Sequence, residues 1–305
     1  MEFFRLPRFK RTTSVAPMQL TERDREIIRL VYRHRFLRSL QIMALIDGSP
    51  QQILRRLQLL YHHGYLERPR AQIDYYYQGG SRHIIYGLGN NGASLLKQEP
   101  GSAFQQFRWN EKSPSTGRMF LEHALLVSDI MVAFELACRK NGQVRLLTEE
   151  NLVHGKNKQK PFRWRVNIDT HLKLSAIPDR VFALEFSDVS GNSNRAYFFL
   201  EADRGTMPVK RNKLLQTSFY RKMLAYEATW SQSIHSTRFG FNRFRVITVT
   251  TSAVRVKSLV NACSQLKGGH GLFLFADQKI LEKPAELLSS LWQTGKRGET
   301  SSFVN

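Results

Sequence analysis

Hydrophobic and polar positions in the first hundred residues follow a helical repeat that later changes to alternation. Thr21 stands where a helix cap is favoured, and Ser39 and Ser49 can cap two further helices, the last with Pro50 at its first position. Gly64 follows the third apolar run, where helices commonly end. Helices are therefore expected at about 22–34, 40–46 and 50–63. Three helices joined by tight turns predict a helix-turn-helix.

After Gly64 the pattern becomes alternating or aromatic. It predicts a short strand at 65–68, a hairpin formed by 73–78 and 83–88, and a closing helical turn at 91–96. A hairpin directly after the third helix is the wing of a winged helix-turn-helix. We assign this domain to residues 19–99, preceded by a flexible basic arm (1–18) and followed by a linker rich in Gly, Ser, Pro and Gln (100–117).

The rest of the chain predicts an α/β domain over residues 118–293, with a disordered tail at 294–305. A long amphipathic helix is expected at 119–140. Strands are expected at about 144–152, 179–186, 196–202, 245–250 and 272–276, and helices at 210–230, 253–266 and 285–292. This order describes a mixed sheet with helices packed on it, so the fold class is multi-domain α/β.

Charge narrows the choice of partners. The chain carries 46 Lys and Arg against 25 Asp and Glu, a net charge of +21, and both halves are basic. Such a field attracts polyanions, with nucleic acid first among them. No stretch reaches the ~18 uninterrupted apolar residues of a membrane-spanning helix, and the two cysteines form no CxxC pair. We expect a cytoplasmic protein without a membrane partner.

The third helix carries the best candidates for reading DNA bases. With Ile53 at the centre of its buried face, Gln51, Gln52 and Arg55 lie on the opposite face near the helix start. Gln can pair with adenine and Arg with guanine in the major groove. His62 shares this outer face, and Arg56 lies at its edge, where a phosphate contact is more natural. The alternative for these residues is a simple solvated helix face.

The predicted wing supplies arginines for the DNA backbone. Arg68, Arg70 and Arg82 flank a hairpin whose tip is Gly79-Gly80-Ser81. The small residues at the tip allow a close approach to phosphate. These arginines would contribute affinity without sequence information.

Three stretches of the chain together resemble the replication-relaxation family, over about residues 20–226. They are "LTERDREIIRLVYRHRFLRSLQIMALI", "GYLERPRAQIDYYYQGGSRHIIYGLGNNGASLL" and "YFFLEADRGTMPV". The last stretch, with "LEADRGT" after a hydrophobic strand, is the most particular of the three. The resemblance implies a DNA-binding protein of plasmids or other mobile elements, involved in their replication, relaxation or transfer.

The second domain resembles the restriction-endonuclease-like superfamily, judged from Pro178-Asp179 on one strand and Glu201-x-Asp203 on the next. The resemblance implies Asp179, Glu201 and Asp203 as catalytic residues and ligands of Mg²⁺, with Glu122 as a helper from the long helix. Period-2 geometry places Glu201 and Asp203 on one face of the strand.

The position that holds lysine in active members of that superfamily holds Asp203 here. An extra carboxylate adds charge for a metal but removes the cation that helps to lower the barrier. Three interpretations remain open: a degenerate domain that does not cleave, which we favour, an active nuclease with a lysine reaching in from the next helix (Lys210, Lys213 or Lys222), and carboxylates that only pair with nearby arginines.

The sequence therefore favours a protein whose winged helix binds double-stranded DNA and whose basic second domain adds contacts or self-association as a homodimer. Its role would be that of an accessory factor or regulator of replication, transfer or transcription, in contact with replication or transfer proteins. The main rival is a metal-dependent endonuclease targeted by its own winged helix. A scaffold whose charge serves only solubility is the third alternative.

Overall fold

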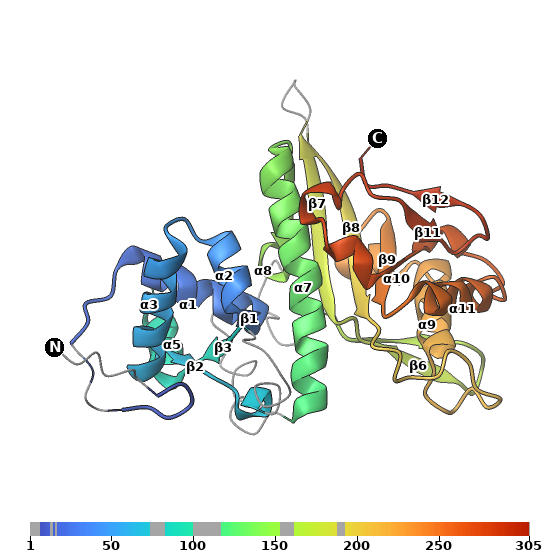
Figure 1. Cartoon of the computed structure of the whole chain (residues 1–305). Helices are drawn as coiled ribbons and strands as arrows, with labels where there is room; N and C mark the ends of the chain where they lie inside the picture. The colour runs from blue at the N-terminus through green and yellow to red at the C-terminus, as the bar shows by residue number, and fades with distance from the viewer. Residues whose placement is uncertain are drawn as a thin grey trace. The chain divides into compact units, whose positions relative to one another are not determined.

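The computed structural model describes residues 7–12, 15, 17–73, 83–99, 117–152, 162–187 and 193–304. The chain divides into two compact units, Met1–Ser128 and Asp129–Asn305, both drawn in Figure 1. Together they make a mixed α/β protein. The predicted linker at 100–117 lies, apart from Gly117, outside the described residues.

The first unit begins with three helices, α1 (Glu22–His34), α2 (Ser39–Leu45) and α3 (Pro50–His62). All three were predicted from the sequence. Thr21 caps α1 by accepting from the Asp24 backbone N–H at 3.3 Å, and Ser49 caps α3 in the same way with Gln52. The predicted cap at Ser39 is wrong, because Ser39 already lies within the helix and is buried.

A three-stranded antiparallel sheet accompanies these helices, in the order β1-β3-β2. Its strands are β1 (Phe36–Arg38), β2 (Leu66–Glu67) and β3 (Ile85–Leu88). Strand β1 was not predicted. The expected first hairpin strand at 73–78 lies outside the described residues except for Ile73, which follows the 3₁₀ turn η1 (Arg70–Gln72). Helix α5 (Asn90–Gln98) is the predicted closing element.

Helix α7 (Arg118–Asn141) contains the boundary between the two units. In the first unit, Leu121, Ala124 and Leu125 join the core formed with Phe36 and Ile85. The helix is followed by Gly142, whose positive φ of 73° suits the chain reversal expected at that position. The predicted long helix is therefore confirmed.

The second unit is built on a seven-stranded mixed sheet with the order β12-β11-β10-β9-β8-β7-β4. Strand β9 runs parallel to both β8 and β10, and the other pairs are antiparallel. The strands are β4 (Val144–Thr148), β7 (Arg180–Ser187), β8 (Ser193–Ala202), β9 (Phe244–Thr250), β10 (Phe273–Asp277), β11 (Trp292–Thr294) and β12 (Thr300–Ser301). A separate hairpin, β5 (Trp164–Asn167) with β6 (Lys173–Ala176), was not predicted.

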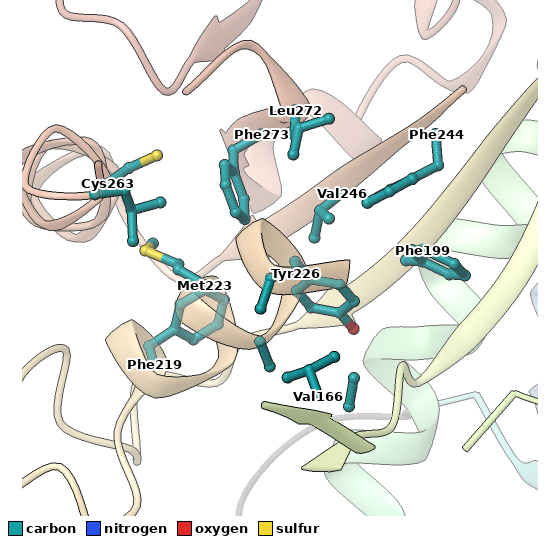
Figure 2. Packing of buried hydrophobic residues seen from close by; sticks show 14 of the residues in the cluster. Val166, Phe199, Phe219, Met223, Tyr226, Phe244, Val246, Cys263, Leu272 and Phe273 are labelled. Atoms are coloured by element: carbon teal, nitrogen blue, oxygen red, sulfur yellow. The ribbon is translucent and has the colours of Figure 1, made fainter. Parts of the chain in front are cut away.

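Helices flank this sheet: α8 (Glu149–Leu152), α9 (Phe219–Ser231), α10 (Ile234–Phe239) and α11 (Ala253–Cys263), with short 3₁₀ turns η2 (His270–Leu272), η3 (Gln278–Leu281) and η4 (Pro284–Glu286). Neighbouring residues of β8 point to opposite faces. Phe198 stacks on Phe182, which contacts Phe134 of α7 at 4.9 Å between ring centroids. Phe199 instead stacks on Tyr226 of α9 at 5.7 Å. The core beneath α9 and α11 is shown in Figure 2.

Three predictions at the edges of the second unit need correction. The helix expected at 210–230 begins only at Phe219, where Ser218 caps it. The helix expected at 285–292 is replaced by turns that lead into β11. The tail expected to be disordered contains β12, and Phe303 packs edge-on against Trp292 and Phe134. These aromatic contacts, which lie far apart in sequence, order the chain end.

Candidate functional site

The first two turns of α3 present a polar face. Ser49 and Pro50 fix the start of the helix, and the side chains of Gln51, Gln52 and Arg55 are exposed. On the opposite face, Ile53, Leu57 and Leu60 are fully buried and anchor the helix in the first unit. The three residues predicted to contact bases therefore share one solvent-facing surface, with the half-exposed Leu54 beside them.

Arg56 does not belong to this surface. Its Nε donates to Asp24 Oδ1 at 2.8 Å, Nη2 donates to Asp24 Oδ2, and Nη2 also reaches the carbonyl of Gln19. Asp24 is fully buried in α1 and also accepts from Thr21. Burial alone would raise the pKa of Asp24, but the hydrogen bonds from Arg56 and Thr21 lower it. Arg56 thus links α3 to α1. This structural role takes the place of the predicted contact with a DNA phosphate.

His62 is buried at the end of α3, contrary to its predicted place on the outer face. The backbone N–H of Thr12 donates to its Nδ1 at 3.3 Å, and its Nε2 has no hydrogen-bond partner within the described parts of the chain. Burial lowers the pKa of His62, and the positive charges of Arg68, Arg11 and His63 lower it further. His62 is therefore held as a neutral ring that accepts a hydrogen bond.

Arg68 is also buried, with an exposed fraction of 5%. Its guanidinium lies 4.1 Å from the centre of the Tyr61 ring and donates to the Tyr86 hydroxyl at 3.1 Å. Nη1 donates to the carbonyl of Arg8 at 2.5 Å. A cation stacked on aromatic rings and enclosed by the chain is a packing element. It is not placed to meet DNA phosphate in this arrangement.

The basic arm contributes to this enclosure over the described residues 7–12. Arg11 Nε donates to the Tyr61 carbonyl at 2.9 Å and Nη2 to the Leu66 carbonyl at 3.1 Å. Nη2 also pairs with Glu67. Arg11 therefore binds the carbonyl-rich end of α3 and the start of β2. The expectation of a free arm does not hold for this segment.

Arg70 is exposed at the start of η1 and keeps its predicted position at the surface. Arg82 lies outside the described residues. Of the seven described residues that were predicted to contact DNA, four are exposed: Gln51, Gln52, Arg55 and Arg70.

In the second unit, Asp179 and Glu201 lie at adjacent ends of β7 and β8. The Asp179 backbone N–H donates to the Leu200 carbonyl at 2.9 Å. Its side-chain Oδ2 accepts from the Ala202 backbone N–H at 2.8 Å. Asp179 therefore continues the pairing of the two strands, and the predicted proximity of Asp179 to Glu201 is present.

Glu201 is 2% exposed and has two side-chain partners on α9. Lys222 Nζ donates to Oε2 and the Tyr226 hydroxyl donates to Oε1, each at 2.6 Å. Burial raises the pKa of Glu201 against the opposing charge of Lys222. Burial alone would lower the pKa of Lys222, but the charges of Glu201 and Asp179 raise it to about 12. The two residues form a strongly coupled ion pair next to Asp179.

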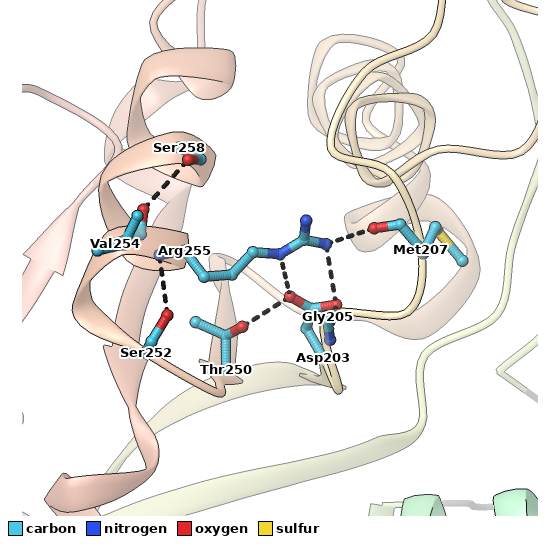
Figure 3. Close-up of polar contacts among 8 residues, drawn as sticks. All are labelled: Asp203, Gly205, Met207, Thr250, Ser252, Val254, Arg255 and Ser258. Carbon is cyan, nitrogen blue, oxygen red and sulfur yellow. Dashed lines mark hydrogen bonds and ion pairs between the residues drawn. The ribbon is translucent and has the colours of Figure 1, made fainter.

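Asp203 forms a different cluster, shown in Figure 3. Arg255 Nε donates to Oδ2 at 2.8 Å and Nη2 to Oδ1 at 3.2 Å, while the Thr250 hydroxyl donates to Oδ2 at 2.7 Å. The Gly205 backbone N–H donates to Oδ1 at 3.1 Å. Both oxygens of Asp203 are thus engaged by donors from β9, α11 and its own turn.

The predicted carboxylates do not gather around one point. The described part of the chain contains no group of three or more acidic, histidine or cysteine side chains placed to hold a metal ion. Glu122, the predicted helper, belongs to the first unit and accepts from Arg118 at 2.9 Å. Asp179, Glu201 and Asp203 each accept from protein donors, so the site as folded does not fit Mg²⁺.

Several contacts that organise these sites were not foreseen. Tyr226 and Arg255 had no predicted role, and Lys222 was one of three lysines considered for a cation at this site. One sequence signal was present: Lys222 and Tyr226 are four residues apart, which places them on the same helix face. Their partner, Glu201, lies 21 positions before Lys222, beyond the reach of local periodicity.

Comparison with known proteins identifies one family. The sequence model of the family described as replication-relaxation matches residues 28–243, which is more than half of the chain. No curated protein and no solved structure matches the chain significantly. No helix within the described residues is long and apolar enough to cross a membrane.

Proposed function

The chain belongs to the replication-relaxation family, and from this premise we propose that it binds double-stranded DNA through a winged helix-turn-helix in its first unit. The process would be the replication, relaxation or transfer of a plasmid or other mobile element. The observation that carries the proposal is the exposed surface of Gln51, Gln52 and Arg55 on α3, opposite a fully buried face.

The arrangement of elements supports this proposal. Helix α3 is the second helix of the turn and follows α2 after only four residues. Strands β2 and β3 then follow, and β3 also pairs with β1, which lies between α1 and α2, as in a winged helix. A recognition helix meets base edges with residues near its N-terminus, and the three exposed side chains lie within the first six residues of α3. Their amide and guanidinium groups can pair with adenine and guanine.

The wing would add phosphate contacts. Arg70 is exposed beside the sheet, and Arg82 is assigned the same role from its place in the sequence. The net charge of +21 supports this assignment, since a positive field attracts DNA before any specific contact forms. Replication or transfer proteins, and a second copy of the chain, are the protein partners that we propose. The proposed location is the cytoplasm, where plasmid DNA resides.

For the second unit we propose a restriction-endonuclease-like domain that does not cleave. Two features support the resemblance: the mixed order β4-β7-β8-β9 and the placement of Asp179 and Glu201 at adjacent strand ends. The engagement of the carboxylates supports the absence of cleavage. Lys222 and Tyr226 take both oxygens of Glu201, and Arg255 and Thr250 bind Asp203.

A metal-dependent endonuclease is the second candidate, favoured by one observation. Asp203 stands where the sequence pattern of the superfamily has lysine, but α9 brings Lys222 to within 2.6 Å of Glu201. A cation at this place could stabilise developing negative charge. For this candidate to hold, Glu201 would have to exchange its present partners for a metal ion.

The proposal is tested by measuring the binding of the full chain to a labelled 30-base-pair duplex by fluorescence anisotropy over a range of salt concentrations. We expect log K to fall linearly with log salt and Arg55→Gln to weaken binding. Arg243→Gln is the matched control, because Arg243 is an exposed arginine of the second unit. Absence of duplex binding at low salt, or equal losses of affinity in the two variants, would contradict the proposal.

A further inference from the structure

A pocket of about 310 Å³ opens in the second unit between β6 and the beginning of α9. Glu201 and Tyr226 form part of its lining, together with Lys173, Arg221 and Lys222. Its volume lies at the lower end of the range for small-ligand sites. From the sequence, Glu201 was assigned to the site and Lys222 was one of three lysines considered for it. Lys173, Arg221 and Tyr226 had no predicted role.

The free charge of the pocket is positive. Glu201 is the one carboxylate among the described residues of its lining, and Lys222 neutralises it. Lys173 is exposed on β6, and within the described residues neither Lys173 nor Arg221 has an ion pair with an acid. Arg221 uses Nη1 to donate to the Leu215 carbonyl at 2.7 Å. This bond orients the guanidinium, and its remaining nitrogens can donate to an anion.

The backbone of α9 is not the anion site. The N–H groups of Phe219 and Tyr220 donate to the carbonyls of Pro208 and Val209, at 3.0 and 2.8 Å. The Arg221 N–H donates to the Ser218 hydroxyl oxygen at 3.3 Å. The first amides of the helix are therefore satisfied within the protein. An anion in the pocket has to be bound by side chains.

The pocket also offers an apolar wall beside its cations. Lys173 and Ser175 lie on one side of β6, and Leu174 between them is buried in the core. Ile177 directly follows the strand and lines the same pocket. Ile177 remains 49% exposed. A ligand that places a phosphate at Lys173 and Arg221 can thus cover Ile177 with a hydrophobic part.

We propose that this pocket binds one nucleotide of an unpaired DNA strand, with its phosphate at Lys173 and Arg221 and its sugar or base against Ile177. In a duplex the base is turned into the stack and cannot follow its phosphate into a concave site, whereas a single strand can present both. The site uses none of the residues of the duplex-binding surface on α3. It therefore gives the protein a second, separate contact with DNA.

The proposal is tested with the full chain and labelled hexathymidine, a single strand whose binding is followed by anisotropy. The pocket variant is Lys173→Gln with Arg221→Gln, and the matched control is Lys257→Gln with Arg243→Gln, two exposed cations elsewhere in the same unit. We expect the pocket variant to bind hexathymidine at least about tenfold more weakly than the wild type. Its slope of log K against log salt should fall by about 1.4, because each cation that meets a phosphate of a single strand contributes ~0.7.

The control should change affinity by less than about twofold at the same salt, since unplaced surface charges contribute little. Gln51→Ala with Arg55→Ala should leave hexathymidine binding unchanged, which separates this site from the proposed duplex surface. If the pocket variant unfolds at a lower temperature than the wild type, Lys173→Gln alone can be compared with the control, because Lys173 is at an exposed strand position.

Equal reductions of affinity in pocket and control variants would overturn the proposal. So would competition by inorganic phosphate at the same concentrations as hexathymidine, because that would assign the pocket to free phosphate.

Discussion

Arg255 and Asp203 form a two-point ion pair in which Nε and Nη2 of the arginine meet the two oxygens of the carboxylate, at 2.8 and 3.2 Å. Arg255 also donates to the Met207 carbonyl at 2.5 Å. The side chains are only 15% and 4% exposed. The pair therefore joins the first turn of α11 to the segment that follows β8, and it gives Asp203 a structural role.

Replacing Arg255 by Met should destabilise the second unit. The substitution leaves the Asp203 charge buried with Thr250 as its remaining side-chain donor, so the free energy of unfolding should fall by about 3 kcal/mol. Urea unfolding followed by circular dichroism measures this change. Lys257→Met, on the same helix but exposed, should change the free energy of unfolding by less than about 0.5 kcal/mol. Similar values for the two variants would show that the ion pair contributes little.

The double variant Gln51→Ala with Arg55→Ala should lose sequence specificity. Base contacts discriminate between sequences, each good bidentate contact by ~1 to 3 kcal/mol, whereas phosphate contacts do not. A preferred duplex selected from a random pool should therefore bind the variant much more weakly, while the affinity for random duplex changes less. Equal reductions of affinity on both DNAs, measured in parallel titrations, would show that α3 does not read bases.

The wing arginines Arg68 and Arg70 should fall into two classes. Arg70→Gln should flatten the salt dependence of duplex binding by about 0.9 in slope, because one cation fewer meets a phosphate. Arg68→Gln should instead lower the unfolding temperature, since it removes the cation stacked on Tyr61 and bonded to Tyr86. Anisotropy titrations and thermal unfolding of both variants test the distinction. An unchanged unfolding temperature in Arg68→Gln would return this residue to the candidate DNA contacts.

His62 should make the stability of the first unit depend on pH. Its pKa is lowered in the folded protein, first by burial and then by the charges of Arg68, Arg11 and His63. Because the unfolded chain has the ordinary value of about 6.5, it binds more protons as the pH falls through this value. The free energy of unfolding should therefore decrease below about pH 6.5 and be fully retained above it.

Urea unfolding at pH 7.5 and pH 5.0 measures this effect in the wild type and in His62→Gln, which cannot take up the proton. The difference between the two pH values should be smaller in the variant. His83→Gln serves as the control, because His83 is an exposed histidine of the same unit and is not among the groups that lower the pKa of His62; it should keep the wild-type difference. A wild-type difference that survives in His62→Gln would assign the effect to another group.

Local signals in the sequence were sufficient for the elements that begin with a cap and continue with a regular apolar repeat. Helices α1 and α3 begin where Thr21 and Ser49 predict, and α11 begins at Ala253 after Ser252. The chain end lacked such signals. Its polar composition suggested disorder, but Phe303 reaches Trp292 and Phe134, a contact that only the tertiary fold creates.

In the candidate sites, too, the sequence failed to predict contacts between segments that are far apart along the chain. Gln51 and Arg55 were assigned correctly to an exposed face, because the phase of one helix determines that face. Arg56 and His62 were also assigned to DNA from the phase of this helix, and Arg68 because it flanks the predicted hairpin. Each instead meets a partner from another segment: Asp24 of α1, Thr12 of the arm and Arg8 of the arm. Distant pairing of this kind is not encoded in local spacing.

The last prediction concerns cleavage: the purified protein should bind supercoiled plasmid without nicking or linearising it in the presence of Mg²⁺ or Mn²⁺. The reason lies in the partners of the carboxylates. A divalent ion requires free oxygen donors. The two oxygens of Glu201 accept hydrogen bonds from Lys222 and Tyr226, and one oxygen of Asp179 accepts from the backbone of β8.

An agarose gel that separates supercoiled, nicked and linear plasmid measures the outcome. Metal-dependent nicking that both Asp179→Asn and Glu201→Gln abolish, with plasmid binding retained, would establish the endonuclease. Nicking that persists in both variants would come from a contaminating nuclease or from another site, and a repeat with Lys222→Gln would show whether this pocket takes any part.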